Sequence, residues 1–281
     1  PEEQEWVARF GITDPQIAVY RMKQADLIAR EPWGGDRRMH REYPFTDEEC
    51  FSASGLCLFP DTVLNRLRQT VQAPARTFRL LATGALSYEA VPTPTPETAD
   101  LWVWKAREEG RQYVLGIDIA DGVGETESVI EVLAFPGYEQ VAEWASNITG
   151  PDRVAAIALW LAERYPCALV VPEINKSGIL VAYMLQQLTG PFDLFRWRYL
   201  ERPGLRESES PRIGWETNSS TKGILAQVAN LLFLRGDGHV RSAVLYGQMK
   251  QCVDLQPGRR WTVEHGRSDR ILAWMIAQVG A

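Results

Sequence analysis

The chain has 281 residues and a mass of 31.7 kDa, which allows one large domain or two ordinary ones. Hydrophobic residues make up 45% and charged residues 23%, a composition that excludes disordered and fibrous classes. No apolar run reaches the roughly 18 residues of a membrane-spanning helix, and the first residues do not show the charged-then-apolar pattern typical of a signal peptide. We therefore expect a globular protein with no membrane partner. None of the four cysteines lies in a CxxC pair, so we expect them to be reduced thiols.

The charge is unevenly distributed along the chain. The net charge is −6, but residues 191–281 hold 13 Lys and Arg against nine Asp and Glu, a surplus of four. An acidic average therefore does not exclude a local basic surface for nucleic acid. Because the chain begins with Pro1 instead of Met, we expect a processed product or a piece of a longer protein.

The N-terminal part reads as mostly helical. Apolar residues at helical spacing predict a helix over 14–29, stopped by Pro32 and the Gly34-Gly35 pair, and a second short helix over 61–72. The segment 91–100 is rich in Pro and Thr and predicts a break between two unlike halves.

Strands and helices alternate after this break. The expected strands are 113–119, 128–135, 139–146, 168–171, 193–200 and 260–264. The expected helices are 151–165, 177–188, 219–234, 242–253 and 268–279. Three meandering strands followed by helix–strand units predict an α/β layered sheet with an antiparallel edge, which binds ligands at its carboxyl-end rim.

Three acids lie at the ends of apolar runs. Asp118 lies near the end of the first expected strand, which is otherwise apolar, Glu173 follows a later strand, and Asp269 opens the final helix. An ionised carboxylate in such a place is costly unless it is paired or liganded. Acids placed in this way can converge on one rim, where oxygen ligands suit Mg²⁺ or Mn²⁺. Two such ions about 4 Å apart would stabilise the attacking and leaving oxygens of a phosphodiester displacement.

Each acid also has a simpler interpretation. A single Asp at a strand end commonly forms a turn, Asp269 could cap its helix, and Glu173 could pair with Lys176. The joint pattern favours a shared site.

Five stretches resemble the nuclease domain of viral large terminases, the DNA-packaging motor subunits of tailed phages. They are 40–51 (HREYPFTDEECF), 113–122 (YVLGIDIADG), 171–178 (VPEINKSG), 213–218 (IGWETN) with Thr221 and Lys222, and 266–270 (GRSDR). The resemblance implies a ribonuclease-H-like mixed sheet flanked by helices, with a mostly helical N-terminal extension. It also implies that Asp118, Glu173 and Asp269 bind the catalytic metals. Residues 1–58 would be the tail of the family's ATPase half and 59–281 the nuclease domain, with its core at about 111–281.

The sequence departs from the family pattern in its acids. Thr126 stands where the family often has another Asp, and the third motif keeps only its last acid, Asp269. Asp121, Glu125 and Glu127 are accessory candidates, with a solvated loop position as the alternative for each. No phosphate-binding Gly-x-x-x-x-Gly-Lys loop is present, so we expect no ATPase activity from this chain.

A group of basic residues is a candidate surface for double-stranded DNA. Its members are Arg196, Arg198, Arg202, Arg206, Arg212 and Lys222. Arg196 and Arg198, alternate residues of one expected strand, should share a face, and arginine binds phosphate without reading base sequence. The alternative is a solvated loop neutralised by its own glutamates.

The expected function is therefore a metal-dependent endonuclease that cuts concatemeric viral DNA in the host cytoplasm. By family resemblance, its partners would be the portal protein and the small terminase subunit. One alternative is a DNA-clamping or motor-docking module of the same fold with weakened catalysis. A third, an actin-like or sugar-kinase-like ATPase, would need a second glycine-rich loop that the sequence lacks.

Overall fold

The computed structural model describes Val7, 11–30, Tyr43, 56–120, Gly124, 126–166, 168–200, 207–256, 260–263 and 266–280. The chain divides into two compact units, Pro1–Leu56 and Cys57–Ala281. In the described parts of both units, no helix combines the length and the apolarity needed to cross a lipid bilayer.

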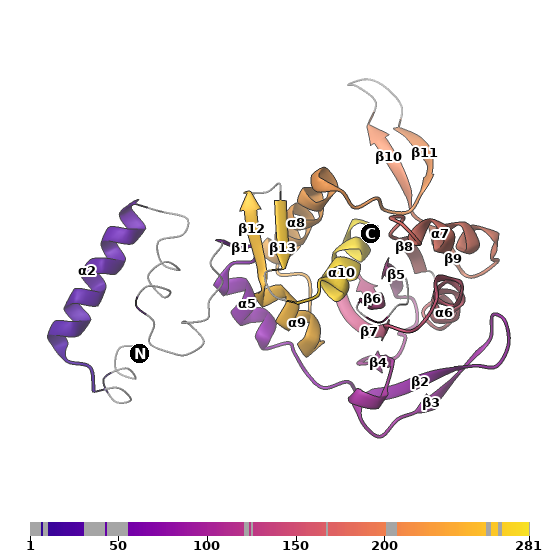
Figure 1. Ribbon diagram of the computed structural model, residues 1–281, viewed down its shortest axis with the longest axis horizontal. Helices are drawn as coiled ribbons and strands as arrows, with labels where there is room; N and C mark the ends of the chain where they lie inside the picture. The colour runs from indigo at the N-terminus through magenta and orange to yellow at the C-terminus, as the bar shows by residue number, and fades with distance from the viewer. Residues whose placement is uncertain are drawn as a thin grey trace. The chain divides into compact units, whose positions relative to one another are not determined.

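The first unit contains helix α2 (Asp14–Arg30), drawn in indigo in Figure 1. Thr13 begins it, because its backbone N–H and its hydroxyl both donate to Gln16 Oε1, at 2.8 and 2.9 Å. This is half of a capping box, which satisfies polar groups at a helix start. The helix predicted over 14–29 is confirmed, whereas Pro32 and the Gly34-Gly35 pair lie outside the described residues.

The second unit is built around an eight-stranded mixed sheet. In spatial order the strands are β3 (Tyr88–Pro92), β2 (Arg76–Ala82), β4 (Leu101–Val103), β7 (Glu139–Ser146), β6 (Ser128–Phe135), β5 (Gln112–Asp118), β8 (Ala168–Pro172) and β9 (Phe192–Leu194). The β5–β8 and β8–β9 pairs are parallel and the other pairs antiparallel. The carboxyl ends of β5 and β8 therefore meet at one edge of the sheet.

Two hydrophobic cores cover the two faces of this sheet. Alternate residues of β5 divide between them: Tyr113, Leu115 and Ile117 pack with α6 (Pro151–Arg164) and α7 (Gly178–Gln187). Val114 packs on the opposite face with α10 (Asp269–Val279). Figure 1 shows α10 beside β5 and β6. Because side chains alternate along a strand, Gly116 and Asp118 face α10 as well.

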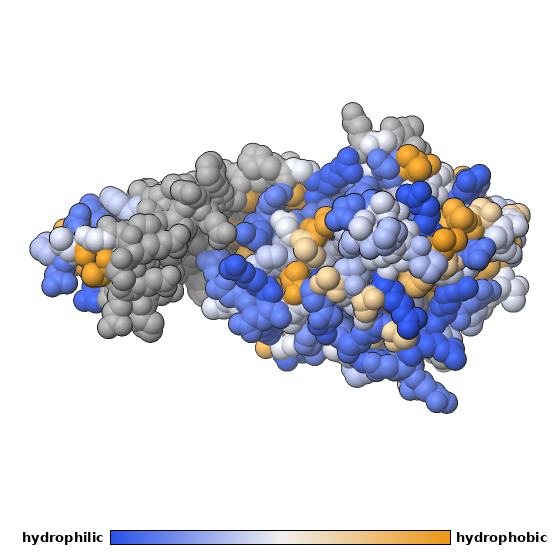
Figure 2. All heavy atoms as spheres, turned by 90° about the horizontal axis from the view of Figure 1, so that it is seen from below, coloured by the Kyte–Doolittle hydropathy of each residue, from blue (hydrophilic) through white to orange (hydrophobic). Residues whose placement is uncertain are grey.

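The remaining elements surround this central layer. The helices are α5 (Asp61–Arg68), η1 (Pro96–Thr98), α8 (Ser219–Leu234) and α9 (Ala243–Lys250). A three-stranded sheet contains β1 (Leu56–Cys57), β12 (Cys252–Gln256) and β13 (Arg260–Val263), and a hairpin contains β10 (Arg196–Leu200) and β11 (Glu207–Ile213). The face of the unit seen in Figure 2 is mostly hydrophilic, with small separate hydrophobic spots.

The predicted mixed sheet flanked by helices is confirmed. The sequence did not predict strands β1, β2, β3, β4, β11 and β12, and three predicted features differ locally. The Pro/Thr-rich segment 91–100 does not separate two units, because β3 and β4 on either side of it belong to the same sheet. The strand expected over 193–200 is divided at Phe195, so β9 joins the large sheet and β10 the hairpin. The helix expected over 242–253 ends at Lys250, where β12 begins after one residue.

Candidate metal centre

Asp118 is positioned by the close approach of α10 to β5. A Cβ atom at Gly116 would lie 2.1 Å from the Ala273 carbonyl oxygen and 2.5 Å from the Ala277 nitrogen, so only glycine fits there. Asp118 lies two residues further along β5, on the same face, and is 8% exposed. This contact sets the distance between α10 and β5.

Glu173 lies beside Asp118 because β8 runs parallel to β5. Ile117 pairs with Pro172, and the Glu173 backbone N–H donates to the Ile117 carbonyl at 2.8 Å. Gly178 makes room for this segment, since a Cβ atom there would lie 2.1 Å from the Glu173 carbonyl oxygen. Glu173 is 6% exposed, and among the described residues no ion pair joins it to Lys176, so the simple pairing alternative finds no support.

Asp269 reaches the same edge from the start of α10. From Ala273 back to Asp269 is about 6 Å along a helix, and from Gly116 forward to Asp118 is about 7 Å along a strand. Helix α10 runs antiparallel to β5, so the start of the helix and the end of the strand lie toward the same edge, where Asp269 interacts electrostatically with Asp118. Asp269 is buried, and its Oδ2 atom accepts a hydrogen bond from the Glu127 backbone N–H at 2.9 Å.

Burial and mutual repulsion favour the protonated form of the acids in this cluster. Burial, the charge of Glu173, a hydrogen-bonding contact with the Glu173 carboxyl and the charge of Asp269 raise the pKa of Asp118 well above its ordinary value. Burial also raises the pKa of Asp269, against the opposing hydrogen bond from Glu127. Among the described residues, no Lys or Arg forms an ion pair with Asp118 or Glu173.

These residues fit a hard divalent cation. The donor set consists only of carboxylate oxygens, which suit Mg²⁺ and Mn²⁺. Within the described ranges, no group of three Asp, Glu, His or Cys side chains already lies close enough together to hold a metal ion, so Asp118, Glu173 and Asp269 would have to draw together around it. An open arrangement is compatible with Mg²⁺, which keeps several waters and is commonly held by one or two carboxylates together with substrate phosphates.

The accessory acids have different positions. The Glu127 carboxylate accepts a hydrogen bond from Arg270 and lies 3.8 Å from Arg267 Nη1. Glu127 therefore contacts Asp269 through its backbone while its side chain is engaged by arginines. Asp121 and Glu125 lie outside the described residues.

The basic residues are divided between two elements. Arg196 and Arg198 lie on β10, but a bulge between them interrupts the alternation from which a shared face was predicted. Arg202 and Arg206 lie outside the described residues. Lys222 lies in the first turn of α8, with its Nζ 5.1 Å from the centre of the Trp261 ring. Arg212 lies 3.2 Å from Glu216.

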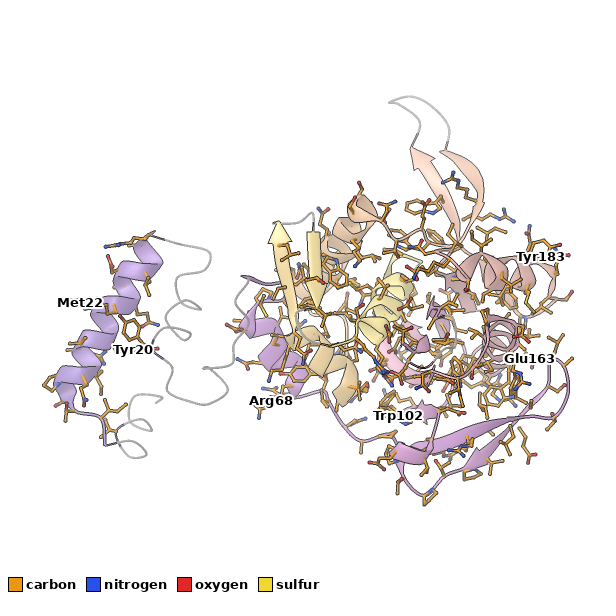
Figure 3. All side chains as sticks on the ribbon, viewed as in Figure 1. Tyr20, Met22, Arg68, Trp102, Glu163 and Tyr183 are labelled. Carbon is orange, nitrogen blue, oxygen red and sulfur yellow. The ribbon has the colours of Figure 1, made fainter. Side chains whose placement is uncertain are left out.

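Sequence reasoning missed a polar network beneath α10. Glu131 of β6 and Glu143 of β7 pair across the sheet, and both accept hydrogen bonds from Gln140 Nε2, at 2.7 and 3.3 Å. Arg270 Nε donates to Glu143 at 2.8 Å, and its guanidinium lies 5.9 Å from the ring centre of Trp102, labelled in Figure 3. A signal was present, because Glu131 and Glu143 interrupt apolar strands as Asp118 does.

Comparisons with known proteins identify the fold. No protein-family model and no curated protein matches the sequence. Crystal structures of the large terminase nuclease from thermophilic phage G20c do match. The form with bound cobalt superposes with a TM-score of 0.53 at 14% identity, covering 81% of this chain and 98% of that one. The form with bound magnesium gives 0.52 at 15% identity, with the same coverage. The chain therefore has the ribonuclease-H-like fold of large terminase nuclease domains.

Proposed function

We propose that this chain is a divalent-metal-dependent endodeoxyribonuclease that cuts concatemeric viral DNA during genome packaging. One observation supports this above the others: Asp118 and Glu173 lie in contact at one sheet edge, within electrostatic range of Asp269, and no Lys or Arg among the described residues forms an ion pair with Asp118 or Glu173. The shared fold adds to it, since the matching phage G20c nuclease structures hold cobalt and magnesium. The metal proposed here is Mg²⁺ or Mn²⁺, with two ions at full occupancy.

The chain's own residues would hold and orient the reacting groups. Strand pairing fixes the backbone of Asp118 and Glu173, and Asp269 accepts a hydrogen bond from Glu127, so only side-chain movement would be needed to bring the three carboxylates around an ion. When bound, divalent ions supply positive charge that stabilises the attacking and leaving oxygens of a phosphodiester displacement. Burial of the three acids keeps bulk water from screening that charge.

The β10–β11 hairpin is the proposed guide for double-stranded DNA. Its strand β11 leads directly to Gly214 and Trp215. The Gly214 backbone N–H donates to the Phe195 carbonyl at 2.9 Å, and the Trp215 backbone N–H donates to the Pro172 carbonyl at 2.8 Å. Trp215 also forms a parallel β-bridge with Glu173, which places the base of the hairpin beside the acids. Figure 1 shows the hairpin projecting from this end of the sheet. We propose that Arg196, Arg198, Arg202, Arg206 and Lys222 contact phosphates there.

The remaining context follows from the proposed packaging role. The portal protein and the small terminase subunit are the proposed protein partners, and the host cytoplasm is the proposed place of action. One alternative, a DNA-clamping or docking module, is favoured by Thr126, which stands where a further acid would strengthen metal binding.

Cleavage of supercoiled plasmid in Mn²⁺ or Mg²⁺ separates the two functions. The nuclease should nick and linearise the plasmid, and Asp118→Asn should slow cutting at least about 100-fold, the scale of losing one electrostatic stabiliser. Asp152→Asn, on the exposed side of α6, is the matched control and should cut like wild type. Intact plasmid with retained DNA binding would instead identify a clamping module.

A further inference from the structure

Arg270 joins the start of α10 to the central sheet through a buried, two-armed ion pair. Its Nε atom donates to Glu143 of β7 at 2.8 Å, and its Nη1 atom donates to Glu127, just before β6. The side chains of Arg270 and Glu143 are 9% and 1% exposed. A pair removed from water in this way is far less screened than a surface salt bridge.

Both ends of this linkage are themselves fixed. Gln140 donates to Glu143, and its own Oε1 accepts from the backbone N–H groups of Arg241 and Ser242, at 2.7 and 2.8 Å. At the other end, the backbone N–H of Glu127 donates to Asp269. Glu127 thus contacts two consecutive residues of α10, one with its backbone and one with its side chain.

The first turn of α10 is held at a third point. Gln248 Oε1 accepts from the Ile271 backbone N–H at 3.0 Å. The glycine contact at Ala273 sets how closely the helix packs, and buried apolar side chains such as Trp274 and Met275 hold the body of the helix in the core. The polar contacts act at the first turn, where a small displacement would move the Asp269 carboxylate toward or away from Asp118.

We propose that Arg270 is the positioning residue that aims Asp269 at the metal centre, acting through Glu143 and Glu127. This inference rests on the proposed nuclease function. An arginine is required because its planar fork reaches two separate carboxylates at once, whereas a lysine ammonium keeps the charge but is a single point. Arg270→Lys should therefore preserve the charge balance but no longer hold the Asp269 carboxylate in its orientation toward the metal centre.

The test measures Mn²⁺ affinity separately from folding. Isothermal titration calorimetry with Mn²⁺ gives the dissociation constant, and thermal unfolding without metal gives stability. We expect Arg270→Lys to weaken Mn²⁺ binding by about 10- to 100-fold, the usual effect of removing a group that orients a ligand. Plasmid cleavage should lose kcat, with the KM for DNA unchanged.

Arg241→Lys is the matched control. Arg241 also pairs with a largely buried carboxylate, Glu139 at 2.5 Å, but among the described residues its side chain contacts neither Asp269 nor Glu127. It should lose stability comparably while keeping wild-type Mn²⁺ affinity. If Arg270→Lys fails to fold, Glu143→Gln decides, because it keeps the shape and removes the charge that anchors Nε.

The outcomes are distinguishable. An Arg270→Lys protein with lowered stability and an unchanged Mn²⁺ dissociation constant would overturn the positioning role while leaving the nuclease intact. A wild-type protein that neither binds Mn²⁺ nor cuts DNA would overturn the proposed function, and the positioning role with it.

Discussion

Gly116 of β5 and Ala273 of α10 approach so closely that a Cβ atom added to Gly116 would lie only 2.1 Å from the Ala273 carbonyl oxygen. This contact lies one helical turn from Asp269 and two strand residues from Asp118. Packing and the candidate site are therefore set by the same pair of residues.

Replacing Gly116 with alanine should force α10 away from β5. We expect a stability loss of about 1–3 kcal/mol from overpacking, together with a marked loss of Mn²⁺-dependent cleavage. Chemical denaturation and plasmid cleavage measure the two effects. Gly247→Ala is the control, because nothing lies within 4 Å of its added Cβ in α9 and it should stabilise by up to about 1 kcal/mol.

The Glu131 carboxyl predicts a specific dependence of stability on pH. It is fully buried, its Oε1 atom has no hydrogen-bond partner in the described part of the chain, and burial together with Glu143 raises its pKa well above the ordinary value. The folded protein thus holds this proton at pH values where the unfolded chain has lost it. Its contribution to stability must fall as pH rises from about 4.3, the unfolded value, through the folded pKa.

Glu131→Gln should therefore stabilise the protein at neutral pH, by on the order of 1 kcal/mol, and the gain should shrink toward pH 4. Glu139→Gln is the opposite control. Burial alone would raise the pKa of Glu139, but hydrogen bonds from Lys105 and Arg241 lower it. That variant should lose stability at neutral pH. Thermal melts across pH 4 to 8 compare them, and equal curves for the two variants would contradict the assignment.

Asn175 should be intolerant of aspartate. Its Nδ2 donates to the Thr217 carbonyl at 2.6 Å and its Oδ1 accepts from the Thr217 N–H at 3.1 Å, which ties the loop after Glu173 to the base of the hairpin. Asn175→Asp sets two oxygens against each other and should cost about 1–3 kcal/mol. Asn147→Asp makes the same change at an exposed 3.2 Å bond and should cost less than about 0.5 kcal/mol by denaturant titration.

The hairpin arginines should govern the salt dependence of DNA binding. In an Asp118→Asn background, which prevents cutting, Arg202→Ala with Arg206→Ala should weaken binding. The slope of log affinity against log salt should flatten by about 0.9 for each phosphate that the variant no longer neutralises. Fluorescence anisotropy over a salt series measures it, with the exposed Arg153→Ala on α6 as control. An unchanged slope would remove both arginines from the DNA path.

The central strands were predictable because they are buried on both faces. The expected bounds of β6 and β7 match the structure, since both are continuous buried runs ended by turn residues. Strand β2 was missed because only Leu80 in it is buried, so its sequence has no clear alternation. The division at Phe195 was also missed, because no Gly or Pro marks the point where the chain leaves the large sheet.

The three acids stand out in the sequence for a different reason. A charged residue at the end of an apolar run stands out, and Asp118 and Glu173 both do so. The linkage through Arg270 did not stand out, because an arginine after a helix-opening Asp reads as a solvated residue. Only the packing of α10 on β6 and β7 reveals that Glu143 lies beneath it.

Asp269 belongs to α10, whereas Asp118 is made some 150 residues earlier. Until α10 has been translated, a growing chain holds at most two of the three carboxylates, and it lacks the helix that packs against Gly116. On the proposed nuclease function, products terminated before α10 would be unable to damage the DNA around them, and the complete site would form only once this helix packs onto the sheet.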